Sequence, residues 1–161
     1  MFGHTYPDCD LQCVKYIDEV IELEGGGEKV AGIICEPVTG ANGIIVPPPE
    51  YFPRLREICD KYGILMIADE IMSGFGRTGR WFAVDHWGVV PDIMSVAKGI
   101  TCGYVPLGAA VVRKHIGDRF KEKFFSHGAT YAGHVLACAT AVMNTTLPHP
   151  PAPNAMSKKE A

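Results

Sequence analysis

Apolar residues recur every three or four positions between residues 11 and 21, with charged residues between them. This spacing is typical of an amphipathic helix. It predicts a helix over 10–22 that begins at Asp10 as the N-cap and ends at the glycines of 25–27. The next apolar run, 30–35, is short and unbroken, which predicts a buried strand.

A second helix is predicted over 50–62, because its apolar positions fall on one face and Gly63 follows as a stop. Three further short runs, 64–68, 92–97 and 107–112, are mainly apolar and predict buried strands. Such strands, with helices between some of them, are typical of an α/β protein whose sheet is covered on both faces. Because not every link is a crossover helix, the strand order stays open.

The end of the chain has a different character. A helical pattern from about 133 to 144 breaks off into a segment with four prolines, which cannot continue a helix and offers little apolar surface to bury. We therefore expect a folded part over 1–146 and a proline-rich, disordered tail over 147–161.

Composition narrows the class of protein. The chain has 161 residues, of which 47% are hydrophobic and 20% charged, a balance typical of a soluble globular protein. A formal charge of −3 and scattered Lys and Arg residues argue against a nucleic-acid partner. No apolar stretch approaches the roughly 20 residues that span a bilayer, and the N-terminus lacks the features of a signal peptide. The six cysteines lack the paired spacing of metal ligands, so we expect no metal site, reduced thiols and a cytoplasmic location.

Two charged residues stand where ligand-binding groups collect in α/β proteins, directly after an apolar run. Asp69 follows the run 64–68, and Lys98 follows the run 92–97. Taken alone, each has an ordinary interpretation, Asp69 as a turn former and Lys98 as a solvated surface residue.

The surrounding sequence changes this interpretation. Residues 68–112 read ADEIMSGFGRTGRWFAVDHWGVVPDIMSVAKGITCGYVPLGAAVV. In the order and spacing of its D-E-I, G-F-G-R-T-G, P-D-I and K-G motifs, this segment resembles the central signature of the class III aminotransferases. Further matches are CEPVTGANGIIVPP at 35–48 and HGATYAGHVLACA at 127–139. The resemblance implies part of the large cofactor-binding domain of the fold type I transferases, with a mixed, mostly parallel sheet and flanking helices.

The resemblance also implies a cofactor, pyridoxal 5'-phosphate, and a role for four residues. Lys98 would form the Schiff base with the cofactor aldehyde and, once displaced, move the substrate proton. Asp69 would pair with the pyridine nitrogen and keep it protonated, which makes the ring an electron sink. Ile71, two residues further along an extended segment, would pack against one ring face. Thr130 would donate its hydroxyl to the cofactor phosphate, in this family across a dimer interface.

Other parts of the family pattern match less fully. Glu36 resembles a carboxylate on the substrate side of the site. Val135 stands where the family commonly has proline. The small-residue phosphate cup that the family carries upstream, and the substrate-binding arginine that it carries downstream, have no match in this chain.

The implied reaction is transamination between an amine donor such as an ω-amino acid and a keto acid such as pyruvate, in a homodimer. Two alternatives stay open. An aminomutase, racemase or decarboxylase of the same fold would reuse Lys98 and Asp69 for another reaction. The chain could also be a truncated, inactive segment of such an enzyme.

Overall fold

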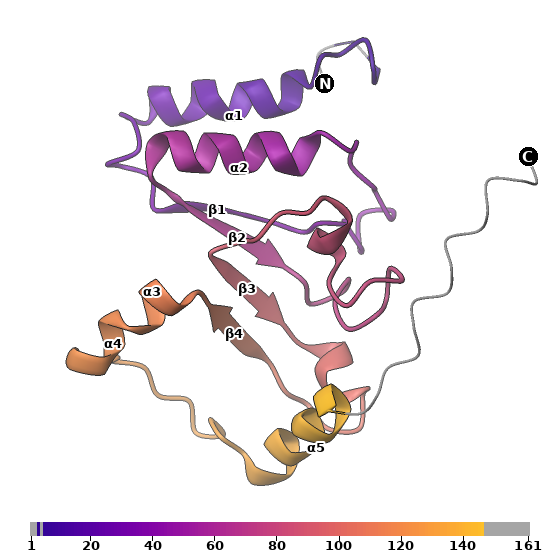
Figure 1. The fold of residues 1–161 in the computed structure, drawn as a ribbon, viewed down its shortest axis with the longest axis vertical. Coiled ribbons are helices and arrows are strands. Elements are labelled where there is room, and N and C mark those ends of the chain that lie inside the picture. The colour runs from indigo at the N-terminus through magenta and orange to yellow at the C-terminus, as the bar shows by residue number, and fades with distance from the viewer. Residues whose placement is uncertain (1–2, 4, 147–161) are drawn as a thin grey trace, which may run out of the picture.

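The computed structural model describes residue 3 and residues 5–146 of the chain (Figure 1). The helices are α1 (Gln12–Leu23), α2 (Tyr51–Tyr62), α3 (Lys114–Gly117), α4 (Arg119–Glu122) and α5 (Val135–Thr146), and two short 3-10 helices are η1 (Ala83–His86) and η2 (Lys98–Thr101). The strands are β1 (Gly32–Cys35), β2 (Leu65–Asp69), β3 (Ile93–Val96) and β4 (Ala109–Val112). The predicted α/β class is confirmed, and each predicted helix and strand is present with small shifts at its ends.

The four strands form one sheet in the order β1-β2-β3-β4. β1 pairs with β2 and β2 with β3 in parallel, whereas β4 returns antiparallel to β3. The sheet is therefore mixed and mostly parallel, as expected. Its three parallel strands point their carboxyl ends in the same direction, which brings the residues that follow them to one edge.

The main core lies between α2 and the sheet. Phe52, Leu55 and Cys59 follow one face of α2 and are fully buried against the equally buried Met66 of β2. Burial raises the pKa of the Cys59 thiol to about 11, as suits an inert, reduced cysteine. α2 ends at Gly63, whose φ of 65° is the left-handed conformation that favours glycine at this position.

The start of α1 differs from the prediction. The N-cap is Leu11 rather than Asp10, and no side chain caps the helix. Asp10 has a φ of 45°, and its carboxylate pairs with Lys15. The positive φ carries Asp10 away from the extended conformation in which an N-cap side chain reaches the helix N–H groups.

The second face of the sheet is only partly covered by the described residues. Ile34, Ile67, Ile93 and Val112 are register neighbours and form one row across all four strands. Ile34 is 61% exposed and Val112 is 40% exposed, while the two central residues are half-buried. The prediction of a sheet covered on both faces therefore holds only for the face beneath α2.

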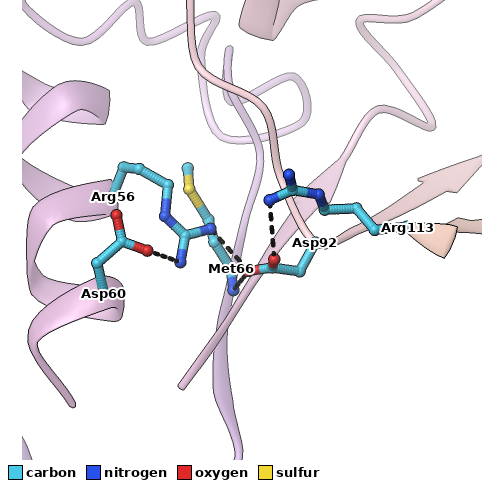
Figure 2. Close-up of polar contacts among 5 residues, drawn as sticks. All are labelled: Arg56, Asp60, Met66, Asp92 and Arg113. Carbon is cyan, nitrogen blue, oxygen red and sulfur yellow. Dashed lines mark hydrogen bonds and ion pairs between the residues drawn. The ribbon is translucent and has the colours of Figure 1, made fainter. Parts of the chain in front are cut away.

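A polar network ties the amino ends of the strands to α2, as Figure 2 shows. Asp92, just before β3, accepts hydrogen bonds from the Met66 N–H at 2.9 Å and from Arg56 Nη1 at 2.7 Å. Arg56 also pairs with Asp60 at 2.9 Å, and Arg113 lies 3.6 Å from the other Asp92 oxygen. The P-D-I motif thus serves the fold at the edge opposite to Lys98.

No helix in the part of the chain that the structure describes is long and apolar enough to cross a membrane. The expected proline-rich tail, 147–161, lies outside the described residues.

Candidate functional site

Three predicted site residues follow the three parallel strands at one edge of the sheet. Glu36 comes directly after β1, Asp69 is the last residue of β2, and Lys98 stands two residues beyond the end of β3. The register pairs Cys35 with Ala68 and Asp69 with Ser95, so these strand ends are neighbours. The structure therefore brings the three residues to the edge where ligands bind in open α/β sheets.

Lys98 begins η2 with a φ of 44°, a left-handed conformation that is uncommon for a residue with a side chain. Backbone strain of this kind costs on the order of 1–3 kcal/mol and is concentrated at functional sites. The Lys98 side chain is exposed, and its amine donates to the thioether sulfur of Met72.

The Lys98 amine lines a cavity of about 580 Å³. The other lining residues come from the turn after β2 and from η2, and they are Met72, Gly74, Phe75, Gly76, Arg77 and Gly99. An exposed primary amine at the wall of such a cavity can react with a carbonyl group of a small molecule that enters it.

Asp69 is half-buried, and its Oδ1 accepts the Ile71 N–H at 3.0 Å. Among residue 3 and residues 5–146, no cationic side chain forms an ion pair with Asp69. A carboxylate oriented by one backbone N–H keeps most of its capacity to accept hydrogen bonds, so it can bind a cationic group of a ligand.

Ile71 does not continue the strand as expected. It lies in a turn, half-buried, because the chain folds back directly after Asp69. The role of Ile71 against a ring face stays a prediction.

Glu36 is engaged locally. Its Oε2 accepts the Gly40 N–H at 2.8 Å, which closes the loop after β1. Gly40 in turn lies against Met72: a Cβ on Gly40 would come within 3.0 Å of the Met72 methyl carbon. The loop that Glu36 closes therefore packs on the side chain that contacts Lys98.

Thr130 is exposed in a turn before α5. No described contact joins it to Lys98 or Asp69, so this chain alone does not assemble all four predicted cofactor contacts. Its expected role across a dimer interface stays a prediction.

Sequence reasoning missed two residues of the site region, Glu70 and Met72. Glu70 is fully buried although it carries a carboxyl group, and Met72 contacts the Lys98 amine. The signal for Glu70 was its place directly after a buried strand. The contact between Met72 and Lys98 joins residues 26 positions apart, and no local pattern indicates it.

A second cavity, of about 610 Å³, is lined by residues of α1, of α2 and of the segment before α1, and by none of the predicted site residues. Six of its charged lining residues form three ion pairs, Lys15–Asp10, Arg54–Glu57 and Lys61–Asp18, and Glu50 accepts the Tyr6 hydroxyl. The cavity that Lys98 lines is the smaller of the two. In the described part of the chain, no cluster of three or more His, Cys, Asp or Glu side chains could hold a metal ion.

Comparison with known proteins shows the family of the chain. The family model described as aminotransferase class-III matches residues 4–148. A putrescine–pyruvate aminotransferase of Pseudomonas aeruginosa is 52% identical over 123 residues, which cover 76% of this chain and 27% of that protein. An adenosylmethionine-8-amino-7-oxononanoate aminotransferase of Geobacter sulfurreducens is 43% identical over 145 residues, 86% of this chain and 32% of that protein.

Solved structures show the same likeness. An (S)-enantioselective omega-transaminase from Thermomicrobium roseum superposes with a TM-score of 0.82 at 46% identity, over 89% of this chain and 32% of that one. A taurine:2-oxoglutarate aminotransferase from Bifidobacterium kashiwanohense, solved with pyridoxal phosphate and glutamate, gives 0.80 at 49% identity, over 87% and 32%. The chain thus spans about a third of the length of these relatives.

Proposed function

Because the chain belongs to the class III aminotransferase family, whose members depend on pyridoxal phosphate, we propose that Lys98 and Asp69 form the covalent and electrostatic part of a transamination site. The observation that carries the proposal is the exposed Lys98 side chain at a cavity wall, two residues after β3, the strand that pairs with the one that ends in Asp69. The proposed reaction moves an amino group from an amine donor to a keto acid.

The residues present fit this cofactor. An aldehyde needs a reachable primary amine, which Lys98 supplies, and a protonated ring nitrogen needs an unpaired carboxylate, which Asp69 supplies. When bound, pyridoxal phosphate supplies the electron sink that makes a carbon-bound proton of the substrate acidic. Lys98 would be the base that removes that proton and the acid that returns it, and Asp69 would hold the ring nitrogen in its cationic form.

The finer substrate assignment rests on relatives. A donor with an ω-amino group is supported by the putrescine–pyruvate and taurine:2-oxoglutarate enzymes, which share 52% and 49% identity with this chain. Pyruvate as the acceptor is supported by the first of these. Six free cysteines suit a reducing, cytoplasmic setting, which we include in the proposal.

A homodimer is also part of the proposal. Thr130 and its neighbours present exposed apolar side chains: Tyr131 is 79%, Val135 is 83% and Leu136 is 60% exposed. Large apolar side chains that are this exposed are the kind that a partner subunit would cover. Analytical ultracentrifugation measures the oligomeric state. A chain that sediments only as a monomer at high protein concentration would count against the dimer.

The test of function supplies the chain with pyridoxal phosphate, pyruvate and either putrescine or taurine, and measures alanine. We expect alanine from the wild type and none from Lys98→Ala. A keto or aldehyde product from the donor separates transamination from racemisation or decarboxylation. Equal alanine with and without Lys98 would contradict the proposed role of this residue.

A further inference from the structure

Glu70 is a buried carboxylate without a described cationic partner. It is 0% exposed, although it directly follows Asp69 at the end of β2. Its Oε2 accepts the Ser73 hydroxyl at 2.6 Å, and its Oε1 accepts the Val84 N–H at 2.9 Å. Burying a carboxyl group costs free energy unless its oxygens are hydrogen-bonded, and each Glu70 oxygen has one donor here.

The two hydrogen bonds hold both sides of the glycine-rich segment 74–82. Ser73 lies in the turn of residues 72–75, at the start of this segment, and Val84 lies in η1, beyond its end. The backbone adds a third tie, because the Gly74 N–H donates to the Glu70 carbonyl at 2.9 Å. Gly74 is pressed so closely on this carbonyl that a Cβ there would lie 2.8 Å from it.

The turn of residues 72–75 contacts both Lys98 and Gly99. A Cβ on Gly99 would lie 2.9 Å from the Phe75 Cβ and 3.3 Å from the Gly74 carbonyl oxygen, so the backbone after Lys98 touches the turn directly. The turn also contains Met72, whose sulfur accepts a hydrogen bond from the Lys98 amine. Both the backbone and the amine of Lys98 therefore depend on where this turn lies.

We propose that Glu70 is a positioning residue for Lys98, which acts by holding the turn of residues 72–75 against Lys98 and Gly99. The proposal rests on the proposed function of Lys98 as the cofactor-binding amine. Glu70 touches neither the amine nor the cavity, so its effect passes through Ser73, Gly74 and Phe75.

The experiment measures which lysines of the intact chain react, in two parallel reactions read by peptide mapping. Pyridoxal phosphate followed by borohydride marks an amine that is placed for the cofactor, whereas formaldehyde with cyanoborohydride marks any accessible amine. The variants are Glu70→Ala, Glu70→Gln and Ser73→Ala. Asp92→Asn is the matched control, because it disturbs a buried carboxylate at the opposite edge of the sheet.

In the wild type, we expect pyridoxal phosphate to mark Lys98 in preference to exposed lysines such as Lys123. Glu70→Ala should lower this preference by about tenfold or more, since a misplacement of a reacting group by about 1 Å can cost on the order of 10²-fold. Glu70→Gln should keep it, because the amide oxygen can accept the Val84 N–H and the amide nitrogen can donate to Ser73. Ser73→Ala, which loses one contact, should fall between them and serves as the test if Glu70→Ala does not fold.

Asp92→Asn should leave the preference of pyridoxal phosphate for Lys98 unchanged, even if its melting temperature falls as far as that of Glu70→Ala. Formaldehyde labelling of Lys98 should be similar in every folded variant. An unchanged preference in both Glu70→Ala and Ser73→Ala, or an equal loss in Asp92→Asn, overturns the positioning role alone. A wild type that shows no preference for Lys98 contradicts the proposed function together with the positioning role.

Discussion

Replacing Asp92 with Asn tests how the sheet edge opposite to the site is held together. The Asp92 carboxylate is 7% exposed and accepts the Met66 N–H and Arg56 Nη1. An asparagine oxygen can still accept from both donors, because both bonds end on the same Asp92 oxygen, but the substitution removes the negative charge that pairs with Arg56 and Arg113. A hydrogen bond to a charged group contributes about 1.5–3 kcal/mol. Because Arg56 retains Asp60, we expect a loss near 2 kcal/mol, or roughly 4–8 °C in melting temperature for a domain of this size.

The pH dependence separates charge from packing. Desolvation raises the pKa of Asp92, but the Met66 N–H and the Arg56 guanidinium outweigh it, and the net pKa lies below the ordinary value of 3.8. A carboxylate with a lowered folded-state pKa contributes stability above the unfolded value and loses it as pH falls through the folded value. The gap between wild type and Asp92→Asn should therefore be full at pH 7 and close as pH falls below about 3.8.

Urea or thermal unfolding at several pH values measures this gap. Asp60→Asn is the control, because the Asp60 side chain is 68% exposed and its pair with Arg56 should contribute no more than about 1 kcal/mol. Equal melting of wild type and Asp92→Asn at pH 7 would refute the reasoning. A gap that persists undiminished in acid would show that the charge of Asp92 is not its source.

Two further substitutions probe the packing around the site and the core. Gly99→Ala should distort the Lys98 turn, because the new Cβ would lie 2.9 Å from the Phe75 Cβ, and pyridoxal phosphate trapping at Lys98 should fall while trapping elsewhere is unchanged. Phe52→Ala should lower the unfolding free energy by about 3–5 kcal/mol, since Phe52 is fully buried between α2 and the sheet, and a loss below 1 kcal/mol in urea unfolding would contradict that packing.

The helices and strands could be predicted from the sequence where a single local signal, an apolar run or a glycine stop, determines the element. Short, mainly apolar runs predicted the strands, and the stop at Gly63 predicted the end of α2. The positions of Asp69 and Lys98 at strand ends followed from the same runs. The antiparallel return of β4 was not readable, because strand direction depends on pairing rather than on local pattern.

The failures have local physical causes. Asp10 is a good N-cap by residue type, but its positive φ and its pair with Lys15 take it out of that role. Ile71 was expected on an extended segment, yet the chain turns as Ile71 donates to Asp69. Glu70 was overlooked because a single Glu side chain is ordinarily exposed. Only the fold shows that the Ser73 hydroxyl and the Val84 N–H donate hydrogen bonds to it.

The most direct test of the central claim is covalent trapping at Lys98. The purified chain is mixed with pyridoxal phosphate, reduced with borohydride and digested, and the adduct is located by peptide mapping in the wild type and in Lys98→Ala. The account predicts that the wild-type adduct is concentrated on the peptide containing Lys98 and that the variant gives only weak, scattered labelling. An adduct spread evenly over the exposed lysines of the wild type, and unchanged in Lys98→Ala, would contradict it.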